Sequence, residues 1–245
     1  MAQYTTEAIV LRVKNWGEAD KMLQFFSRDR GRIPAVAFGC RRPKSPLAGG
    51  MQLFNHLDVT LQQGDRLATV RQCSLRDRFR KLDEDLTAMA YGSFVAELAA
   101  ELAPEGQPQP ELFDRLLAVF SAFDRHNSRL VALAAGYQLL ELAGLQLNYA
   151  QCTHCGKRLD GDAWFDAAEG GAFCPDCRTA AGIPYPAGQR EFICRLAALD
   201  WAAPPQFSVK KAALLAAENL LLTYLRNLLG RDLKSLRFIR MTNTV

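Results

Sequence analysis

Short apolar runs separated by turns fill the first 80 positions, and after Val10 the first run alternates hydrophobic and polar residues with the period of two typical of a half-buried β-strand. In the first run, Ile9, Leu11 and Val13 share one face. Arg12 and Lys14 share the other face. Turns rich in Gly and Asp separate the runs. We expect five strands, at residues 5–14, 21–27, 32–38, 54–62 and 67–75.

Five short strands joined by meander-like turns suit a small barrel, and the OB-fold is the commonest five-stranded barrel. We therefore predict an OB-fold nucleic-acid-binding domain over residues 1–80. A basic loop over residues 39–50 joins its third and fourth strands.

From Leu82 onward the apolar period becomes helical: Leu86, Ala90 and Phe94 recur every four residues, and Pro104 ends that helix. The last long helix has Ser208 as its N-cap and Gly230 just past its end. Its leucines face nearly all round, so we expect burial on several sides. The helices are predicted at residues 82–102, 111–126, 128–143 and 209–229.

Two C-x-x-C pairs interrupt the helical region: Cys152 and Cys155, then, after eighteen residues, Cys174 and Cys177. Each pair can place two thiolates on one turn, and four soft ligands suit a tetrahedral zinc ion. The prediction is one structural Zn²⁺ in a zinc-binding insertion over residues 150–180. The fold class is thus α+β and multidomain, with an all-α domain over residues 81–245 that carries an embedded four-cysteine zinc knuckle.

Two disulfides or a redox centre are the alternatives to metal. Neither pair opens a helix after a buried strand, as a thioredoxin-type motif does. His154 lies between two cysteines and is expected to point away, because four cysteines already close the shell. The remaining cysteines, Cys40, Cys73 and Cys194, are expected to be small buried hydrophobes.

Two kinds of segment that the sequence lacks, a secretory signal and a membrane span, bear on the cellular compartment of the protein. The chain opens without a basic segment followed by an apolar core, so no secretory signal is expected. No run of about 20 uncharged residues is present for a membrane span. Seven cysteines in such a chain favour a reducing compartment. We expect a cytoplasmic protein with no membrane partner.

The net charge of +4 is unevenly distributed. Residues 1–80 carry 14 Lys and Arg against 7 Asp and Glu, a net of +7. Residues 81–204 carry 9 against 17, a net of −8, and residues 205–245 carry 7 against 2, a net of +5. Basic ends and an acidic centre indicate a polyanionic partner, most commonly nucleic acid.

An OB-fold binds single strands with a cationic groove and stacking aromatic rings. The aromatic residues available for stacking are Trp16, Phe26, Phe38 and Phe54. The core of a small barrel also needs aromatic side chains, so some of these rings could be buried there instead. The arginines could equally be solvated surface residues. The predicted nucleic-acid-binding residues are Arg12, Lys14, Trp16, Arg28, Arg30, Arg32, Arg41, Arg42 and Lys44.

The knuckle itself has acidic flanks that repel phosphate, so it is expected to fasten the helical region or to contact protein. A weaker signal lies in the basic C-terminal segment. Lys210 and Lys211 occupy the first turn of the last long helix, and four further cations follow that helix, Arg231, Lys234, Arg237 and Arg240. They are either a solvated helix flank and tail or a second contact for DNA or for an acidic peptide.

Enzymatic signatures are absent from the sequence: it holds no phosphate-binding G-x-x-x-x-G-K loop, no G-x-S-x-G and no H-E-x-x-H. We expect no enzymatic activity. A thiol or metal enzyme ranks third, after a DNA-binding protein and a protein-interaction scaffold stabilised by zinc with little DNA binding.

Several segments together resemble RecO, a family of bacterial recombination mediators. They include Thr-Glu-Ala-Ile-Val-Leu-Arg-Val at residues 6–13, Gly-Glu-Ala-Asp at 17–20, Phe-Ser-Arg-Asp-Arg-Gly-Arg at 26–32 and Gly-Cys-Arg-Arg-Pro-Lys-Ser at 39–45. Leu-Leu-Glu-Leu-Ala-Gly at 139–144 and Leu-Gly-Arg-Asp-Leu-Lys-Ser at 229–235 continue the resemblance to the C-terminal part of the chain.

The resemblance implies an N-terminal OB-fold, a helical domain and an embedded zinc site that some members lack. It also implies a role in DNA repair and recombination: binding of single- and double-stranded DNA, annealing of complementary strands, and loading of RecA together with RecR. A nucleoid-associated location follows. The acidic C-terminal tail of single-stranded DNA-binding protein is a further implied partner. Lys210 and Lys211 are the candidates to rim the groove for this tail.

Overall fold

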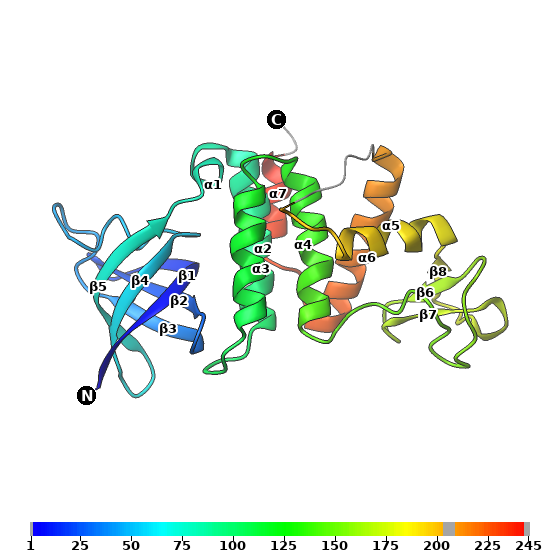
Figure 1. Cartoon of the computed structure of the whole chain (residues 1–245), viewed down its shortest axis with the longest axis horizontal. Helices are drawn as coiled ribbons and strands as arrows, with labels where there is room; N and C mark the ends of the chain where they lie inside the picture. Colours follow the sequence, from blue (N-terminus) through cyan, green and yellow to red (C-terminus); the bar gives the residue numbers. More distant parts are fainter. Residues whose placement is uncertain (1, 203–208, 243–245) are drawn as a thin grey trace.

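The computed structural model describes residues 2–202 and 209–242. A β-barrel lies at one end, helices form the middle, and a small three-stranded sheet lies at the other end (Figure 1). None of the helices in these ranges is both long and apolar enough to cross a membrane.

The barrel is closed, with strand order β1-β2-β3-β5-β4 and β4 returning to β1. The five predicted strands are confirmed, and their bounds are β1 Gln3–Trp16, β2 Asp20–Ser27, β3 Gly31–Ala37, β4 His56–Gln62 and β5 Ala68–Asp77. All neighbouring strands are antiparallel except β3 and β5, which pair in parallel. Residues 3–9 of the long strand β1 pair with β4, whereas residues 8–16 pair with β2.

The loop between β3 and β4 closes one end of the barrel core. Its Leu47 and Met51 are buried with the inward-facing residues of the strands. The strand predicted to begin at Phe54 begins two residues later, because Phe54 adopts a positive φ of 71°. Its side chain turns out of the barrel and packs against Phe120 of the helical part.

Seven helices are described, with bounds α1 Arg80–Glu84, α2 Leu86–Leu102, α3 Pro110–Ala122, α4 Ser128–Leu142, α5 Ala187–Ala197, α6 Lys211–Leu229 and α7 Ser235–Thr242. Asp85 separates α1 from α2: its backbone is extended and its carboxylate accepts the Ala88 N–H as an N-cap. Asn127 caps α4 in the same way, and Gly230, with a φ of 65°, ends α6.

Four expectations for the helices need correction. The single helix predicted at 82–102 is divided at Asp85 into α1 and α2. The helix predicted at 111–126 ends at Ala122, and the segment after Gly230 forms α7 rather than a tail. The N-terminal half of α6 is largely accessible, with Leu215 exposed, so that helix is not buried on several sides there. The predicted cap Ser208 lies outside the described residues.

The outer face of the barrel packs against α2 and α3. Phe26 contacts Phe113 of α3 with ring centroids 5.9 Å apart, and Ile9 and Leu11 belong to the same buried cluster as the helices. Ion pairs surround this apolar contact, including Arg12 with Glu101. The basic barrel therefore meets acidic helices, and part of the charge asymmetry of the sequence is neutralised inside the molecule.

Candidate metal centre and nucleic-acid interface

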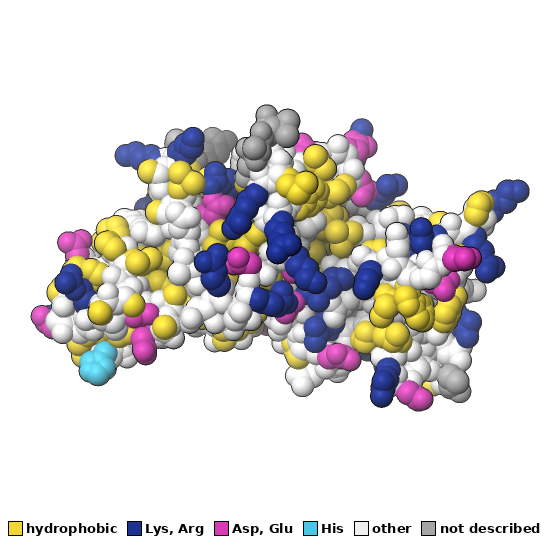
Figure 2. Space-filling view, turned by 180° about the vertical axis from the view of Figure 1, so that it is seen from behind, with side chains coloured by type: hydrophobic (Ala, Val, Ile, Leu, Met, Phe, Trp, Pro, Cys, Tyr) yellow, Lys and Arg dark blue, Asp and Glu magenta, His cyan; other side chains and the backbone are white. Residues whose placement is uncertain are grey.

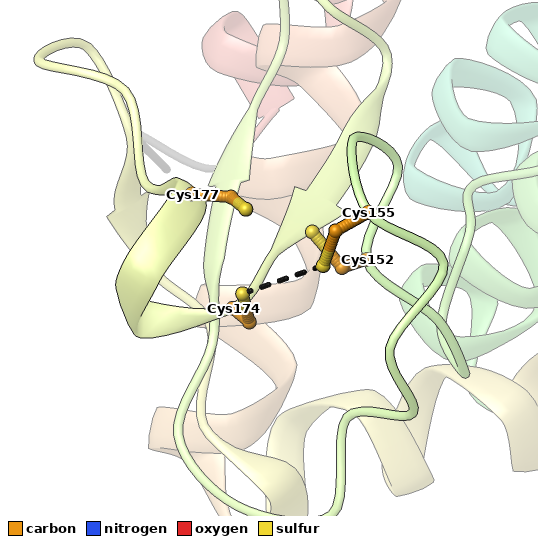
Figure 3. A group of neighbouring side chains, drawn as sticks. All are labelled: Cys152, Cys155, Cys174 and Cys177. Carbon is orange, nitrogen blue, oxygen red and sulfur yellow. Dashed lines mark hydrogen bonds between the residues drawn. The ribbon is translucent and has the colours of Figure 1, made fainter.

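The cysteines lie in a small module between α4 and α5. Its sheet has the order β7-β6-β8, formed by β6 Trp164–Asp166, β7 Gly171–Phe173 and β8 Ile183–Pro184. Cys152 and Cys155 come from the loop before β6, whereas Cys174 and Cys177 follow β7, at the 3-10 turn η1, Pro175–Cys177 (Figure 3). The β6–β7 hairpin thus brings the two pairs together.

All four Sγ atoms lie within 4.8 Å of one another, and Sγ of Cys155 is 3.8 Å from Sγ of Cys174 (Figure 3). A tetrahedron with Zn–S bonds of about 2.3 Å has edges of about 3.8 Å, so the sulfurs have the spacing of one metal shell. All four thiols are free, and a disulfide would need sulfurs about 2.05 Å apart. The group could therefore hold a metal ion.

Backbone hydrogen bonds shape the first knuckle. The N–H of Cys152 donates to the Lys157 carbonyl, and the N–H of Gly156 donates back to the Cys152 carbonyl, at 2.8 and 2.9 Å. Gly156 takes a φ of 71°, which favours glycine. The N–H of Thr153 donates to Ala172 of β7, so the knuckle is attached to the hairpin that carries the other pair.

Cys152 and Cys177 differ in the acidity of their thiols. Burial opposes ionisation of Cys152, but the backbone N–H groups of Cys155, Cys174 and His154 lower the pKa of its thiol to about 6. The neighbouring sulfur of Cys174, chiefly, raises the pKa of the Cys177 thiol to about 12. When thiols lie this close together, each thiolate that forms makes it harder for the next thiol to lose its proton. A cation that binds all four as thiolates removes this repulsion.

His154 takes no part in the group of four, and its side chain is exposed. Of the other three cysteines, Cys40 is buried and Cys73 is half-buried, whereas Cys194 is exposed, so the expected burial is wrong for Cys194. The acidic flanks of the knuckle are engaged locally, for example Asp160 with Arg158 at 2.8 Å.

Arg190 of α5 attaches the module to the helices, a role that sequence reasoning missed. Its side chain is buried and donates to the carbonyl oxygens of Leu159, Gly161 and Tyr185, each at 2.7 Å. No carboxylate pairs with it among the described residues. Because all three acceptors are backbone atoms, no residue type in the sequence could have indicated the contact.

The predicted nucleic-acid residues of the barrel fall into two groups. In the first, three arginines face the helices: Arg12 pairs with Glu101, Arg28 with Asp114, and Arg32 donates to the Ala100 carbonyl at 2.9 Å. Arg30 lies nearby, with its guanidinium 4.0 Å from the centre of the Tyr4 ring. These contacts give the first three arginines a role at the domain boundary.

The second group forms what we call the barrel tip: Lys14, Trp16, Phe38, Arg41, Arg42 and Lys44. Trp16 and Phe38 are 46% and 54% exposed, with ring centroids 6.3 Å apart and planes at 44°. The four cations are exposed, and among the described residues none makes an ion pair. Arg41 instead donates to the Gly17 carbonyl at 3.3 Å, which holds the loop against the β1–β2 turn.

Of the other rings considered for stacking, Phe26 and Phe54 are buried in the contact with the helices. They are therefore core residues. The exposed Trp16–Phe38 pair is the aromatic surface that the barrel presents beside its cations.

Lys210 and Lys211 lie at the exposed start of α6, where Lys210 is the N-cap residue and its side chain makes no capping hydrogen bond. Exposed Leu215 follows one turn later. Their assignment to a peptide site stays a prediction.

Comparison with known proteins decides the family. The family model described as Recombination protein O N terminal matches residues 1–79, and the one described as Recombination protein O C terminal matches residues 83–237. The chain belongs to the RecO family.

Curated relatives agree along nearly the whole chain. DNA repair protein RecO of Pelotomaculum thermopropionicum is 35% identical over 241 residues, which cover 98% of this chain and 94% of the relative. DNA repair protein RecO of Symbiobacterium thermophilum is 34% identical over 249 residues, covering 98% and 97%. DNA repair protein RecO of Anaeromyxobacter dehalogenans is 33% identical, covering 94% and 93%.

Membership in RecO confirms the resemblance found in the sequence and makes this a protein of a DNA repair family. RecO is a family of recombination mediators rather than a known enzyme family. The two family models meet between residues 79 and 83, where β5 has ended and α1 begins.

Proposed function

We propose that this RecO protein is a non-enzymatic recombination mediator that binds single- and double-stranded DNA through the barrel tip. The supporting observation is the exposed Trp16–Phe38 pair surrounded by Lys14, Arg41 and Arg42. Aromatic rings stack on bases of any sequence, and cations follow the phosphates. A closed five-stranded barrel is the OB-fold architecture that uses this mode of binding, and we assign the barrel to it.

The wider role follows from this binding. The protein would anneal complementary strands and, with RecR, help to load RecA onto single strands covered by single-stranded DNA-binding protein, in the cytoplasm and at the nucleoid. The acidic tail of that binding protein would dock at the start of α6, where Lys210 and Lys211 adjoin exposed Leu215.

The metal in this proposal is one structural Zn²⁺. The donor set supports it: four thiol sulfurs close a tetrahedral shell and leave no position for water or substrate. Cys152, Cys155, Cys174 and Cys177 would hold the ion, and its role would be to join the first knuckle to the β6–β7 hairpin.

DNA binding is tested by titrating a labelled single strand at low and moderate salt. Affinity should fall steeply as salt rises, because phosphate contacts release counterions. Replacing Arg41, Arg42 and Lys44 by Glu should weaken binding to all sequences alike. Binding that is absent, or that does not respond to salt, would leave a zinc-stabilised interaction scaffold as the better account.

A further inference from the structure

A second set of cations adjoins the barrel tip, shares Lys14 with it, and lies where β1 faces the segment between α6 and α7. Arg12 and Lys14 of β1 and Arg231 and Lys234 of the α6–α7 segment line one groove of about 920 Å³. Its apolar lining includes Val13, Met22 and Leu53. Two segments more than 200 residues apart in sequence thus contribute cations to one surface, which we call the boundary groove.

Helix α7 extends this charge beyond the groove. Ile239 is buried and Leu236 packs against the core, whereas the side chains of Arg237 and Arg240 are exposed. Residues 226–240 hold five cations and one acid, Asp232. Figure 2 shows Lys and Arg side chains crossing the middle of the molecule between the helices and the barrel.

Two glutamates of α2 hold the groove together. Glu101 accepts hydrogen bonds from both Arg12 and Arg231, the latter at 2.6 Å. Burial opposes ionisation of Glu101, but Arg12 and Arg231 lower its pKa, so the carboxylate is charged at neutral pH. Glu97 accepts the backbone N–H groups of Lys234 and Ser235 at 3.0 and 2.8 Å, which fixes the start of α7.

The side chains of Lys14, Lys234 and Arg237 make no ion pair among the described residues. Positive charge therefore remains after the glutamates have been counted. Lys14 and Lys234 line the groove. The groove adjoins the tip, because Arg12, Lys14 and Trp16 lie on one face of β1, about 6.6 Å apart along the strand.

We propose that the boundary groove and the exposed face of α7 form a second phosphate-binding surface, which takes the continuation of the DNA strand held at the barrel tip. The proposal rests on the proposed DNA binding of the tip. A strand of roughly six nucleotides would occupy the tip alone, whereas one of roughly 20 would reach α7.

The first test replaces Lys234 and Arg237 together by Ala and compares the double variant with Arg158→Ala/Arg195→Ala, which removes two exposed cations elsewhere. For the long strand, loss of two phosphate contacts should make the slope of log affinity against log salt shallower by about 1.4. When salt rises from 50 to 200 mM, the factor by which the variant loses affinity should be about seven times smaller than the factor for the wild type. The short strand and the control pair should show no change.

In the second test, the substitution should increase the affinity for DNA. Glu101→Gln removes the carboxylate that competes with phosphate for Arg12 and Arg231, so the long strand should bind more tightly while the short strand is unaffected. Asp160→Asn, in the zinc module, is the matched control. A groove that only joins the domains predicts no gain in affinity.

The outcomes separate the two levels of the proposal. If the wild type binds neither strand, the tip proposal fails. If it binds both, but the Lys234/Arg237 double variant keeps the wild-type salt slope on the long strand, the boundary groove is not a DNA surface. If that variant instead loses binding of a labelled Asp-rich peptide, the groove belongs to an acidic peptide and the inference is overturned.

Discussion

At the scale of single residues, the same side-chain type performs different tasks according to what it meets. Arg190 is buried and satisfied by three carbonyl oxygens, Arg28 pairs with Asp114 at the domain boundary, and Arg41 stays exposed at the tip. The sequence indicates a basic barrel, but which of its arginines remain available depends on where α2 and α3 dock. Local patterns do not contain that information.

Replacing Arg190 by Met should destabilise the protein by about 3 kcal/mol, because three buried carbonyls lose a charged donor. Urea unfolding measures the change. Arg195→Met, an exposed residue on the same helix that pairs with Glu191, is the control and should change stability by less than about 0.5 kcal/mol. Equal effects of the two changes would contradict the role given to Arg190.

Arg28→Gln and Arg41→Gln separate the two groups of barrel cations. Arg41→Gln should weaken single-strand binding and make its salt slope shallower by about 0.7, as expected for one lost phosphate contact. Arg28→Gln should leave the slope unchanged, because its guanidinium already faces Asp114 and Glu7. Anisotropy titrations at several salt concentrations give both slopes. The assignment fails if Arg28→Gln lowers the slope as much as Arg41→Gln does.

At the scale of elements, the sequence predicts features that depend on local residue spacing, but it does not predict features that depend on contacts between distant segments. The strands follow the period of two, and the four cysteines meet because each C-x-x-C pair forms its own turn. The sequence predicts no helix at α7, because eight residues carry only a weak periodic signal. Its position depends on Glu97, more than 130 residues earlier, which accepts the N–H groups at its start.

Removing the metal should loosen the module without unfolding the barrel. Zinc binding at a tetrathiolate site contributes on the order of 10 kcal/mol and is linked to local folding. Hydrogen exchange after chelation should increase over residues 150–185 and stay unchanged in β1–β5. Cys174→Ser should reproduce the effect, and Cys194→Ser, which lies outside the group of four, should not. Unchanged exchange in the module would rule out a structural metal.

At the scale of the whole molecule, the uneven charge of the chain has two consequences. The basic barrel and the acidic helices neutralise one another where they touch, through pairs such as Arg12 with Glu101. The cations that remain exposed gather at the barrel tip and along the boundary groove and α7. The charge count predicted a polyanionic partner, but only the packing of the two parts shows which surfaces keep their charge.

The central claim is that DNA lies on the barrel tip, and a short single strand tests it most directly. We would measure the affinity of a six-nucleotide strand for the wild type and for Trp16→Ala/Phe38→Ala at low salt. Each stacked base contributes about 1–3 kcal/mol, so losing both rings should weaken binding at least about 30-fold. Because both rings are exposed, the variant should keep the stability of the wild type. Equal affinity for the two proteins would contradict the account.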